Sequence, residues 1–570
     1  MKIGLLLLVF CMSGRFLNAQ AQGWSWAKSG ANTTNSLARS VATDPAGNVY
    51  IVGEYSGSIT FESTTLTTAG TNGLYVVKYS SNGDQLWATS VVSSTTVKLY
   101  CNAITADING DVYLAGEFTG SILFNTTQIS SVGWKDIFVA KLNADGTFAW
   151  GKTHGTKWDE SIRAGISIDS KHYITIAGEF CGAGGSPPEK ESINFDNHVL
   201  TSQGNDDILI ARYDSSGKVL WAKDIGSKNS ELALSSTITP SGKLLVVGNF
   251  NYKLKIDSLP ELVSISSGFV VADCFVAEFD SNGNALWAKV IGGRRPVGGL
   301  NGGSVICKLV TSDIEGNAVI GGLYSDCDVM VDSIILPPRD YDVGTYDMWF
   351  AKYDSSGNFK WAKSAKSINP ELLNGLTADK DGNIYLTGQY GYGCVFDTVT
   401  ATTPGTAHAY MFVAKYGSDG SLKWLSTVGG ITGAAGMGIA VDGSGVPIVA
   451  GRFIDTILNI GSSVVFNKSG YNGFVAKMGV PTGIKTEHHP VDDVFLYPNP
   501  ASDRLYVHFK QNVGPIRYQF YDARGLLVAF GAIDNSNTYA MTLPTLANGV
   551  YYVRLFGPQN SFTKKVIISH

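Results

Sequence analysis

The chain has 570 residues, too many for one compact core, since single domains usually stop growing near about 250–300 residues. It is 44% hydrophobic and 16% charged, with 66 Gly against 18 Pro, which excludes a disordered chain and favours short strands joined by tight turns. A formal net charge of −5 provides no basic field for phosphates and argues against a nucleic-acid partner.

The first 21 residues have the pattern of a secretory signal peptide. Lys2 precedes an apolar run from Ile3 to Met12, and small residues follow in Ala19-Gln20-Ala21. The run is too short for a membrane span, which needs about 18 apolar residues, and no later window reaches that length. We therefore expect removal of residues 1–21 on export and no transmembrane segment in the mature chain.

A pattern of 62 to 74 residues repeats through residues 22–480. Each copy has an apolar segment such as GNVYIVGEY, and the seven copies share glycines at Gly53, Gly116, Gly178, Gly248, Gly322, Gly388 and Gly451. A segment such as FVAKYG follows each of them. A third segment follows in six copies and carries Trp87, Trp150, Trp221, Trp287, Trp361 and Trp424.

Each copy therefore supplies about four strands. The GNVYIVGEY segment is apolar at consecutive positions, so both of its faces must be buried, as in sheets stacked around an axis. The stretch GEFTGSILFNTTQISSVGWKDIFVAKLNADGTFAW resembles the SBBP-type β-propeller repeat. We expect an all-β, seven-bladed β-propeller; the resemblance implies a fold but no activity.

After the predicted signal peptide comes GWSWAKSG, residues 23–30, which resembles the tryptophan segment that ends the later copies. The seventh copy lacks this segment and runs from FVAKMG into Pro481. We therefore predict that Trp26 lies in an N-terminal strand that pairs beside Phe474–Lys477 and closes the ring. An unclosed ring would leave a strand edge and an apolar sheet face in water.

The connections between strands differ in length. Turns such as Asp44-Pro45-Ala46-Gly47 join the first two strands, and DSSG-type turns join the last two. Some of these turns, such as DKDGN, are similar to calcium-binding loops but lack the full ligand spacing of an EF-hand. A role as hairpin turns explains all copies of this turn. The longer connections emerge on the opposite face, where function on such scaffolds usually resides, and include an expected extra hairpin in each copy.

Candidate ligand-binding residues on that loop-bearing face are of two kinds. Trp134, Trp158 and Tyr392 could stack on a ligand, and the polar candidates are Lys157, Asp159, Arg294 and Arg295. Loop aromatics can equally plug gaps between blades. No nucleophile elbow, metalloprotease motif or phosphate loop occurs, so we expect no catalytic site, metal or cofactor.

Some other motifs have ordinary explanations beside functional ones. The three tripeptides that begin at Asp257, Asp332 and Asp397 are similar to a bacterial O-glycosylation signal, but turn chemistry explains them as well. The pair His488-His489 lies in a polar linker, residues 481–493, where a solvated tether is expected. The six cysteines of the mature chain show no C-x-x-C spacing and are expected to be isolated buried thiols.

Residues 494–570 change to alternating strands and predict a small antiparallel β-sandwich. They resemble the type A C-terminal sorting domain of the type IX secretion system of Bacteroidetes. The features that carry the resemblance are Tyr497-Pro498-Asn499-Pro500, the turn ending at Gly525, Gly549 before the penultimate strand, and Lys564-Lys565. The resemblance implies that the secretion machinery is a partner and that the protein reaches the cell surface or the medium.

The sequence thus predicts an exported, non-catalytic binding or adhesion propeller whose ligand is a glycan or a protein. Two alternatives stay open: an enzyme acting on an extracellular polymer through the loop-bearing face, and a purely structural surface protein.

Overall fold

The computed structural model describes residues 23–479 and 494–569. Short gaps fall at 33, 69–71, 94–97, 164, 182–189, 267–271, 295–302, 340–344, 368, 392, 402–408, 430–431, 469, 510–515, 523–526, 534–537, 544–545 and 557–560. The predicted signal peptide and the linker 481–493 lie outside this range, so those boundaries stay predictions. All regular elements in the described part are β-strands, and the chain forms two compact units, Met1–Thr482 and Gly483–His570.

The described part of the first unit contains seven sets of at least four antiparallel strands, which we call sheets 1 to 7. Their first strands are β3 (Ser36–Thr43), β9 (Leu99–Ala106), β16 (Ile166–Ile168), β22 (Glu231–Ile238), β28 (Ser304–Ser312), β34 (Leu372–Ala378) and β40 (Ala434–Val441). The second strands are β4 (Val49–Tyr55), β10 (Val112–Phe118), β17 (Ile174–Cys181), β23 (Leu244–Phe250), β29 (Ala318–Ser325), β35 (Ile384–Tyr390) and β41 (Pro447–Phe453).

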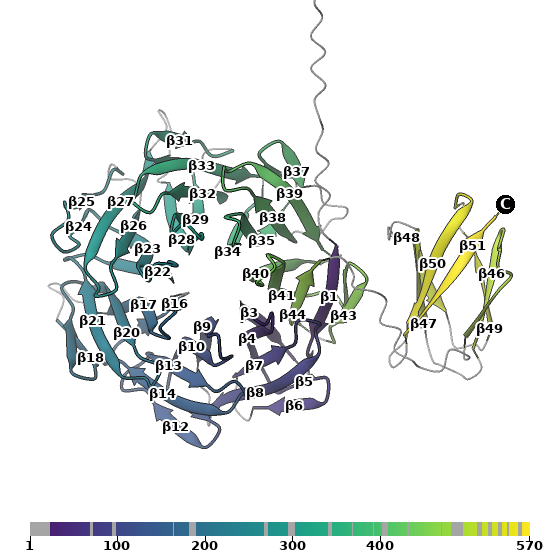
Figure 1. Cartoon of the computed structure of the whole chain (residues 1–570), viewed down its shortest axis with the longest axis horizontal. Helices are drawn as coiled ribbons and strands as arrows, with labels where there is room; N and C mark the ends of the chain where they lie inside the picture. Colours follow the sequence, from purple (N-terminus) through teal and green to yellow (C-terminus); the bar gives the residue numbers. More distant parts are fainter. Residues whose placement is uncertain are drawn as a thin grey trace, which may run out of the picture. The chain divides into compact units, whose positions relative to one another are not determined.

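The third strands are β7 (Gly73–Tyr79), β13 (Asp136–Leu142), β20 (Asp206–Tyr213), β26 (Asp273–Phe279), β32 (Asp347–Tyr353), β38 (Tyr410–Tyr416) and β44 (Asn472–Met478). The fourth strands are β8 (Gln85–Ser93), β14 (Phe148–His154), β21 (Val219–Ile225), β27 (Ala285–Arg294), β33 (Phe359–Lys366), β39 (Leu422–Val428) and, in sheet 7, β1 (Trp24–Ser29). Figure 1 shows the sheets in a propeller-like ring, with the first strands nearest the centre.

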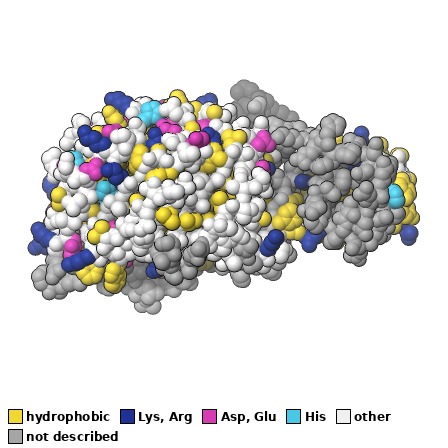
Figure 2. Space-filling view, turned by 90° about the horizontal axis from the view of Figure 1, so that it is seen from below, with side chains coloured by type: hydrophobic (Ala, Val, Ile, Leu, Met, Phe, Trp, Pro, Cys, Tyr) yellow, Lys and Arg dark blue, Asp and Glu magenta, His cyan; other side chains and the backbone are white. Residues whose placement is uncertain are grey.

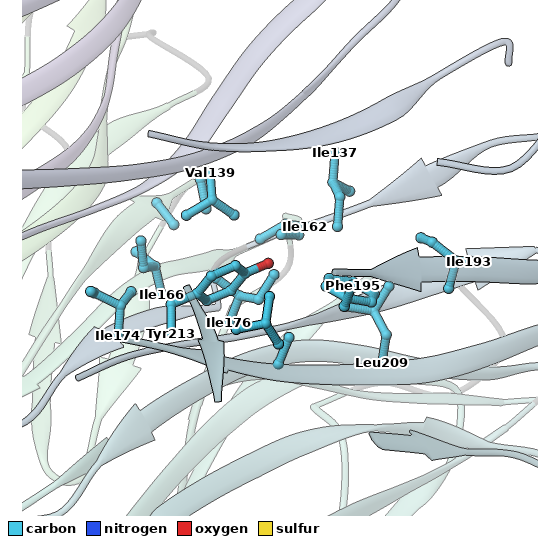
Figure 3. Close-up of a cluster of buried hydrophobic side chains, with 14 of the residues drawn as sticks. Ile137, Val139, Ile162, Ile166, Ile174, Ile176, Ile193, Phe195, Leu209 and Tyr213 are labelled. Carbon is cyan, nitrogen blue, oxygen red and sulfur yellow. The ribbon is translucent and has the colours of Figure 1, made fainter. Parts of the chain in front are cut away.

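The middle strands are buried on both faces, as their consecutive apolar residues predict. All seven residues of β4 and of β7 are buried. Neighbouring sheets pack their side chains together; between sheets 2 and 3, Ile137 and Val139 meet Ile176 and Leu209 in one cluster with Tyr213 (Figure 3). Such stacking removes both faces of each middle strand from water, which is the main source of stability for a repeated sheet.

The predicted pairing of the N-terminal strand is present. Strand β1 pairs antiparallel with β44, with Trp26 opposite Lys477 and Ser29 opposite Phe474. Sheet 7 therefore takes one strand from residues 24–29 and three from residues 434–478, which explains why the segment after the predicted signal peptide resembles the last segment of the repeat.

At five junctions the tryptophan of the fourth strand donates a hydrogen bond to the next sheet, whereas Trp287 donates to Glu278 of its own sheet. Trp26 donates from Nε1 to the Ser81 carbonyl of sheet 1 at 3.2 Å. The same bond recurs at the five-to-six junction, from Trp361 to the Ser418 carbonyl at 3.1 Å. The turn that receives Trp26 contains Gly83, which has a φ of +86° and where a Cβ would lie 2.8 Å from the indole. Glycine is thus required there by conformation and by packing.

The lysine two residues after the tryptophan points to the same neighbour. Lys28 pairs with Glu62 at 2.9 Å, and the equivalent Lys363 pairs with Asp397 at 3.2 Å. These acids sit at hairpin turns with positive φ, as do Asp257, which pairs with Lys223, and Asp332. Turn chemistry and ion pairing therefore account for the aspartates whose tripeptides resemble a glycosylation signal.

An extra hairpin follows the second strand in every sheet, as predicted. The hairpins are β5 (Ser58–Phe61) with β6 (Thr64–Thr67), β11 (Ser121–Phe124) with β12 (Thr127–Ser130), β18 (Ser192–Phe195) with β19 (His198–Thr201), β24 (Lys253–Leu254) with β25 (Leu262–Val263), β30 (Asp328–Val331) with β31 (Ile334–Leu336), β36 (Cys394–Phe396) with β37 (Val399–Ala401), and β42 (Ile457–Ile460) with β43 (Ser463–Phe466). Strands β11, β30 and β36 pair with the fourth strand of the preceding sheet. Their hairpin partners β12, β31 and β37 lie toward the periphery of the ring in Figure 1, and the pairing covers sheet edges that would otherwise be open.

Five of the six mature cysteines have described side chains. All five are buried and form no disulfide in the structure: Cys101, Cys274, Cys307, Cys327 and Cys394.

The second unit contains two antiparallel sheets in its described part. One has the order β45-β46-β49 and the other β48-β47-β50-β51. The strand bounds are β45 (Val494–Tyr497), β46 (Arg504–Phe509), β47 (Ile516–Asp522), β48 (Leu527–Ile533), β49 (Thr538–Thr542), β50 (Gly549–Phe556) and β51 (Ser561–Ile568). Side chains from both sheets, among them Leu505, Val507, Phe520 and Val553, form one buried cluster.

Ring closure can be tested by substituting Trp26. We expect Trp26→Ala to destabilise the ring by about 3 kcal/mol, because a buried indole and its contact with sheet 1 are lost. Hydrogen exchange of Phe474–Lys477 should accelerate, and deletion of residues 22–30 should accelerate it further. The half-buried Ser25→Ala is the control. Unchanged protection of Phe474–Lys477 in the deletion variant would show that closure does not depend on the N-terminal strand.

Candidate functional site

Two loops on the loop-bearing face meet where sheet 2 adjoins sheet 3. The first, residues 131–135, leads into β13, and the second, residues 155–159, joins β14 to the short edge strand β15 (Glu160–Ser161). Together they carry four of the residues that the sequence singled out. Both loops rest on the buried cluster of Figure 3, to which β13 contributes Ile137 and the second loop's continuation contributes Ile162.

A buried carboxylate holds the first loop. Asp136 is 0% exposed and accepts hydrogen bonds from the backbone N–H groups of Val132 at 2.7 Å and Gly133 at 3.2 Å. Gly133 lies against the second loop so closely that a Cβ would overlap the Thr156 carbonyl. The sequence therefore requires glycine at this position for the two loops to meet.

A second buried carboxylate holds the second loop. Glu160, also 0% exposed, accepts from the Thr156 N–H at 3.1 Å and from the Thr156 hydroxyl at 2.5 Å. The Lys135 N–H donates to the Trp158 carbonyl at 3.3 Å, and the Glu160 N–H donates to the Lys135 carbonyl at 2.7 Å. The loops are therefore fixed to each other by backbone bonds as well as by the two carboxylates.

The outer surface of these loops carries two tryptophans. Trp134 is 70% exposed, and its ring meets Trp158 edge-on, with centroids 6.2 Å apart and planes at 60°. The Trp158 Nε1 donates to Glu191 Oε1 at 3.3 Å, and Lys157 Nζ pairs with the same oxygen at 2.7 Å. Lys157 Nζ also lies 5.7 Å from the centre of the Trp158 ring. We call Trp134, Lys157, Trp158, Asp159 and Glu191 the two-tryptophan cluster.

The same loop framework recurs where sheet 3 adjoins sheet 4, without the tryptophans. Asp207 accepts from the Gln203 N–H, and Glu231 accepts from the Ser227 N–H at 2.8 Å and hydroxyl at 2.6 Å. The positions equivalent to Trp134 and Trp158 are Asn205 and Asn229, by alignment of the two aspartate–glutamate pairs. The framework therefore does not need indoles at these positions.

Burial and mutual repulsion shift the pKa values of these carboxyl groups upward. Burial raises the pKa of Glu160 to about 8, with a smaller contribution from neighbouring Asp136, and also raises that of Asp136. At the next junction burial raises the pKa of Asp207 to about 7. Near sheets 5 and 6, burial together with Asp347 raises the pKa of Glu371 to about 9.

The structure brings together Trp134, Lys157, Trp158 and Asp159 as one surface. Arg294 lies elsewhere, at the end of β27 opposite Asp328 of β30. Arg295 and Tyr392 fall outside the described residues. The sequence reasoning missed Glu191 and the carboxylate framework; the repeated spacing of G-x-x-D, as in Gly133 to Asp136, and of [ST]-x-x-x-E could have indicated the framework.

Hollows also occur on the opposite face, which carries the short turns. One, of about 310 Å³, is lined by turns that include Asp169, Asp313 and Asp379. Each of these carboxylates already has a cationic partner; Asp313, for example, pairs with Lys352 at 2.8 Å. The described residues contain no group of three or more histidine, cysteine or acidic side chains placed to hold a metal.

In the second unit the predicted motif residues meet at the last strand. Asn499 donates from Nδ2 to the Lys565 carbonyl at 3.1 Å and accepts from the Ile567 N–H at 2.8 Å. Gly549 begins β50 opposite Ile568, and Lys564 and Lys565 lie in β51. Gly525 lies outside the described residues.

Residues 495–569 match the family model described as a secretion system C-terminal sorting domain. The second unit is therefore a sorting domain. It directs the protein to the type IX secretion machinery and through it to the cell surface or the medium. Among the described residues there is no helix that is long and apolar enough to span a membrane.

The chain is also similar to two distant curated relatives. It is 24% identical over 534 residues to an uncharacterized WD repeat-containing protein of Acanthamoeba polyphaga mimivirus, covering 79% of this chain and 38% of that protein. It is 23% identical over 294 residues to the regulatory protein FlaEY of Caulobacter vibrioides, covering 49% of this chain and 29% of that protein. The chain thus spans less than half the length of either curated relative.

Solved structures are similar only at low scores. A protein of unknown function from Dyadobacter fermentans aligns with 10% identity and a TM-score of 0.34, over 80% of this chain and all of that one (100%). The extracellular domain of a protein described as a one component system from B. thetaiotaomicron aligns with 11% identity and a TM-score of 0.20, over 96% and 98%. These values carry no argument about function.

The raised pKa values predict a pH dependence of stability. A carboxyl group whose pKa is higher when folded contributes its stabilisation below the unfolded pKa and loses it as the pH rises through the folded value. For Glu160, Asp207 and Glu371 the stabilisation is therefore lost over a pH range that begins near the unfolded pKa of about 4. The range ends at the folded pKa, which is about 8, 7 and 9 respectively. We expect the thermal midpoint to fall between pH 5 and pH 9, and the variant E160Q/D207N/E371Q to show a flatter profile. An equally steep profile in that variant would contradict the assignment.

The sorting function can be tested by transfer. Residues 482–570 fused behind a signal peptide and a fluorescent reporter should carry the reporter across the outer membrane of a host with the type IX machinery. The same fusion without residues 494–570 is the control and should stay periplasmic. A periplasmic reporter in both cases, while the native protein is exported, would show that this unit is not a sufficient signal.

Proposed function

We propose that the first unit is a closed seven-bladed β-propeller of the SBBP type, that a β-sandwich sorting domain exports it, and that it acts outside the cell as a non-catalytic binding or adhesion module. The ligand binds on the loop-bearing face at the two-tryptophan cluster. One observation carries this proposal. The same loop framework bears Asn205 and Asn229 where sheet 3 adjoins sheet 4, but it bears two indoles, one of them mostly exposed, where sheet 2 adjoins sheet 3.

The energetic argument concerns the exposed indole. An exposed tryptophan gives up the stabilisation that burial would provide, about 25 cal/mol for each Å² of apolar surface. The loop that bears Trp134 is nevertheless fixed by Asp136 and by its backbone bonds to the second loop. A rigid loop loses little conformational entropy when a ligand binds, so this surface is preorganised for an aromatic contact.

The carboxyl pair beneath the cluster does not favour the enzyme alternative. Asp136 and Glu160 have the raised pKa values expected of a catalytic acid, but both are fully buried and engaged by backbone N–H groups. The equivalent Asp207 and Glu231 make the same bonds under loops that have no tryptophan. This repetition supports a structural role in holding loops.

The proposal can be tested with arrays of glycans and extracellular proteins. The mature full-length protein should give specific hits, and W134N/W158N should lose them, because the substitution introduces the residues of the neighbouring junction. The variant N205A/N229A alters the equivalent loops and should bind like the wild type. Hits that persist in W134N/W158N would place the ligand elsewhere, and a complete lack of hits would favour a structural surface protein.

A further inference from the structure

We propose that the two-tryptophan cluster binds a neutral polysaccharide, with a pyranose ring stacked on Trp134 and its hydroxyl groups held by the charged side chains beside Trp158. This inference rests on the proposed function and adds the chemical class of the ligand. It follows from the shape of the aromatic surface, from the polar groups at its border and from the local balance of charge.

The two indoles form a corner rather than a flat patch. The Trp158 ring meets the Trp134 ring at 60° and is half-buried, so the faces of Trp134 supply most of the open aromatic surface. Val132, which is 77% exposed, lies two residues before Trp134 on the same loop. The open apolar surface of Trp134, Val132 and part of Trp158 is small, and it matches the C–H face of a single sugar ring better than the larger apolar core of a protein interface.

The border of the corner offers hydrogen-bonding groups that sugars use. Glu191 Oε1 is shared by the Trp158 Nε1 and the Lys157 ammonium group, which orients both the carboxylate and the amine. The Lys157 side chain is still 58% exposed, and Asp159 is exposed beside it. Fixed carboxylate and ammonium groups around an aromatic face can accept from and donate to vicinal hydroxyl groups.

The charges around the corner favour a neutral ligand. Lys157 pairs with Glu191 at 2.7 Å and Lys135 with Glu117 at 3.4 Å, so these four charges offset one another. Exposed Asp159 adds one negative charge, and exposed Lys190, next to Glu191 in the sequence, adds one positive charge. A phosphate or uronate would meet Asp159 and Glu191 with no surplus of cations to offset the repulsion. On the face drawn in Figure 2, basic and acidic side chains are likewise interspersed. A nucleic acid, which also stacks on aromatic rings, needs the basic groove that is lacking among these residues.

Affinity electrophoresis of the mature full-length protein tests the inference. Native gels would contain hydroxyethyl cellulose, laminarin, xylan, galactomannan or dextran, with polygalacturonate and single-stranded DNA as charged probes. We expect at least one neutral polysaccharide to retard the wild type, and W134N/W158N to weaken that binding by about tenfold or more. The N205A/N229A variant should be retarded like the wild type, and unfolding midpoints of both variants would establish that they fold.

The outcomes separate this inference from the proposed function. Retardation by a neutral polysaccharide that disappears in W134N/W158N supports both. If only charged probes retard the protein, and W134N/W158N abolishes this retardation, the ligand is not a neutral polysaccharide but the binding site stands. The same holds if all array hits are proteins and W134N/W158N abolishes these hits. Retardation by a neutral polysaccharide that is unchanged in W134N/W158N overturns the site itself.

Discussion

The pairing of β1 with β44 is the contact on which the first unit depends. Without it, sheet 7 would expose the edge of β44, and sheet 1 would lose the indole of Trp26 that fastens its turn. The entropic cost of joining ends roughly 450 residues apart is only about 5 kcal/mol, because loop-closure entropy grows with the logarithm of length. Burial of Trp26 and one strand ladder can offset that cost, so a ring closed by distant segments is stable.

The contact that Trp26 makes with sheet 1 recurs at other junctions of the ring, and it allows the turns of the sheets to differ in sequence. Five of the fourth-strand tryptophans, Trp26 and Trp361 among them, donate to a backbone carbonyl of the next sheet, so these bonds do not depend on which side chain that turn carries. The ion pairs differ between sheets, and both partners change together. In sheet 5, Lys352 pairs with Asp313. In sheet 4 the equivalent residues are Glu278 and Thr239, and Glu278 pairs instead with Lys243 at 2.9 Å. A frame held in this way can carry different loops at each junction.

The sequence predicted the repeat, the closing strand and the hairpins because these depend on patterns that recur along the chain. It placed Trp134, Lys157 and Trp158 on one face of the ring, but their meeting at one junction is seen only in the structure. It could not predict Glu191, which reaches the cluster from beyond a long insert, nor the burial of Asp136 and Glu160, because burial of a polar group depends on the packing of two sheets. Arg294 was grouped with the site by face alone, and that criterion does not fix the position around the ring.

Fluorine NMR on the mature protein labelled with 5-fluorotryptophan can observe the proposed binding site and the strands of the ring separately, because the chain has 11 tryptophans and most of them lie in those strands. The W134N and W158N variants would assign two resonances. When each neutral polysaccharide is added in turn, we expect at least one to shift the resonances of Trp134 and Trp158, while those of Trp26 and the other fourth-strand tryptophans stay in place. Shifts confined to the tryptophans of the ring strands, or no shift at Trp134 with any of these polysaccharides, would contradict this expectation.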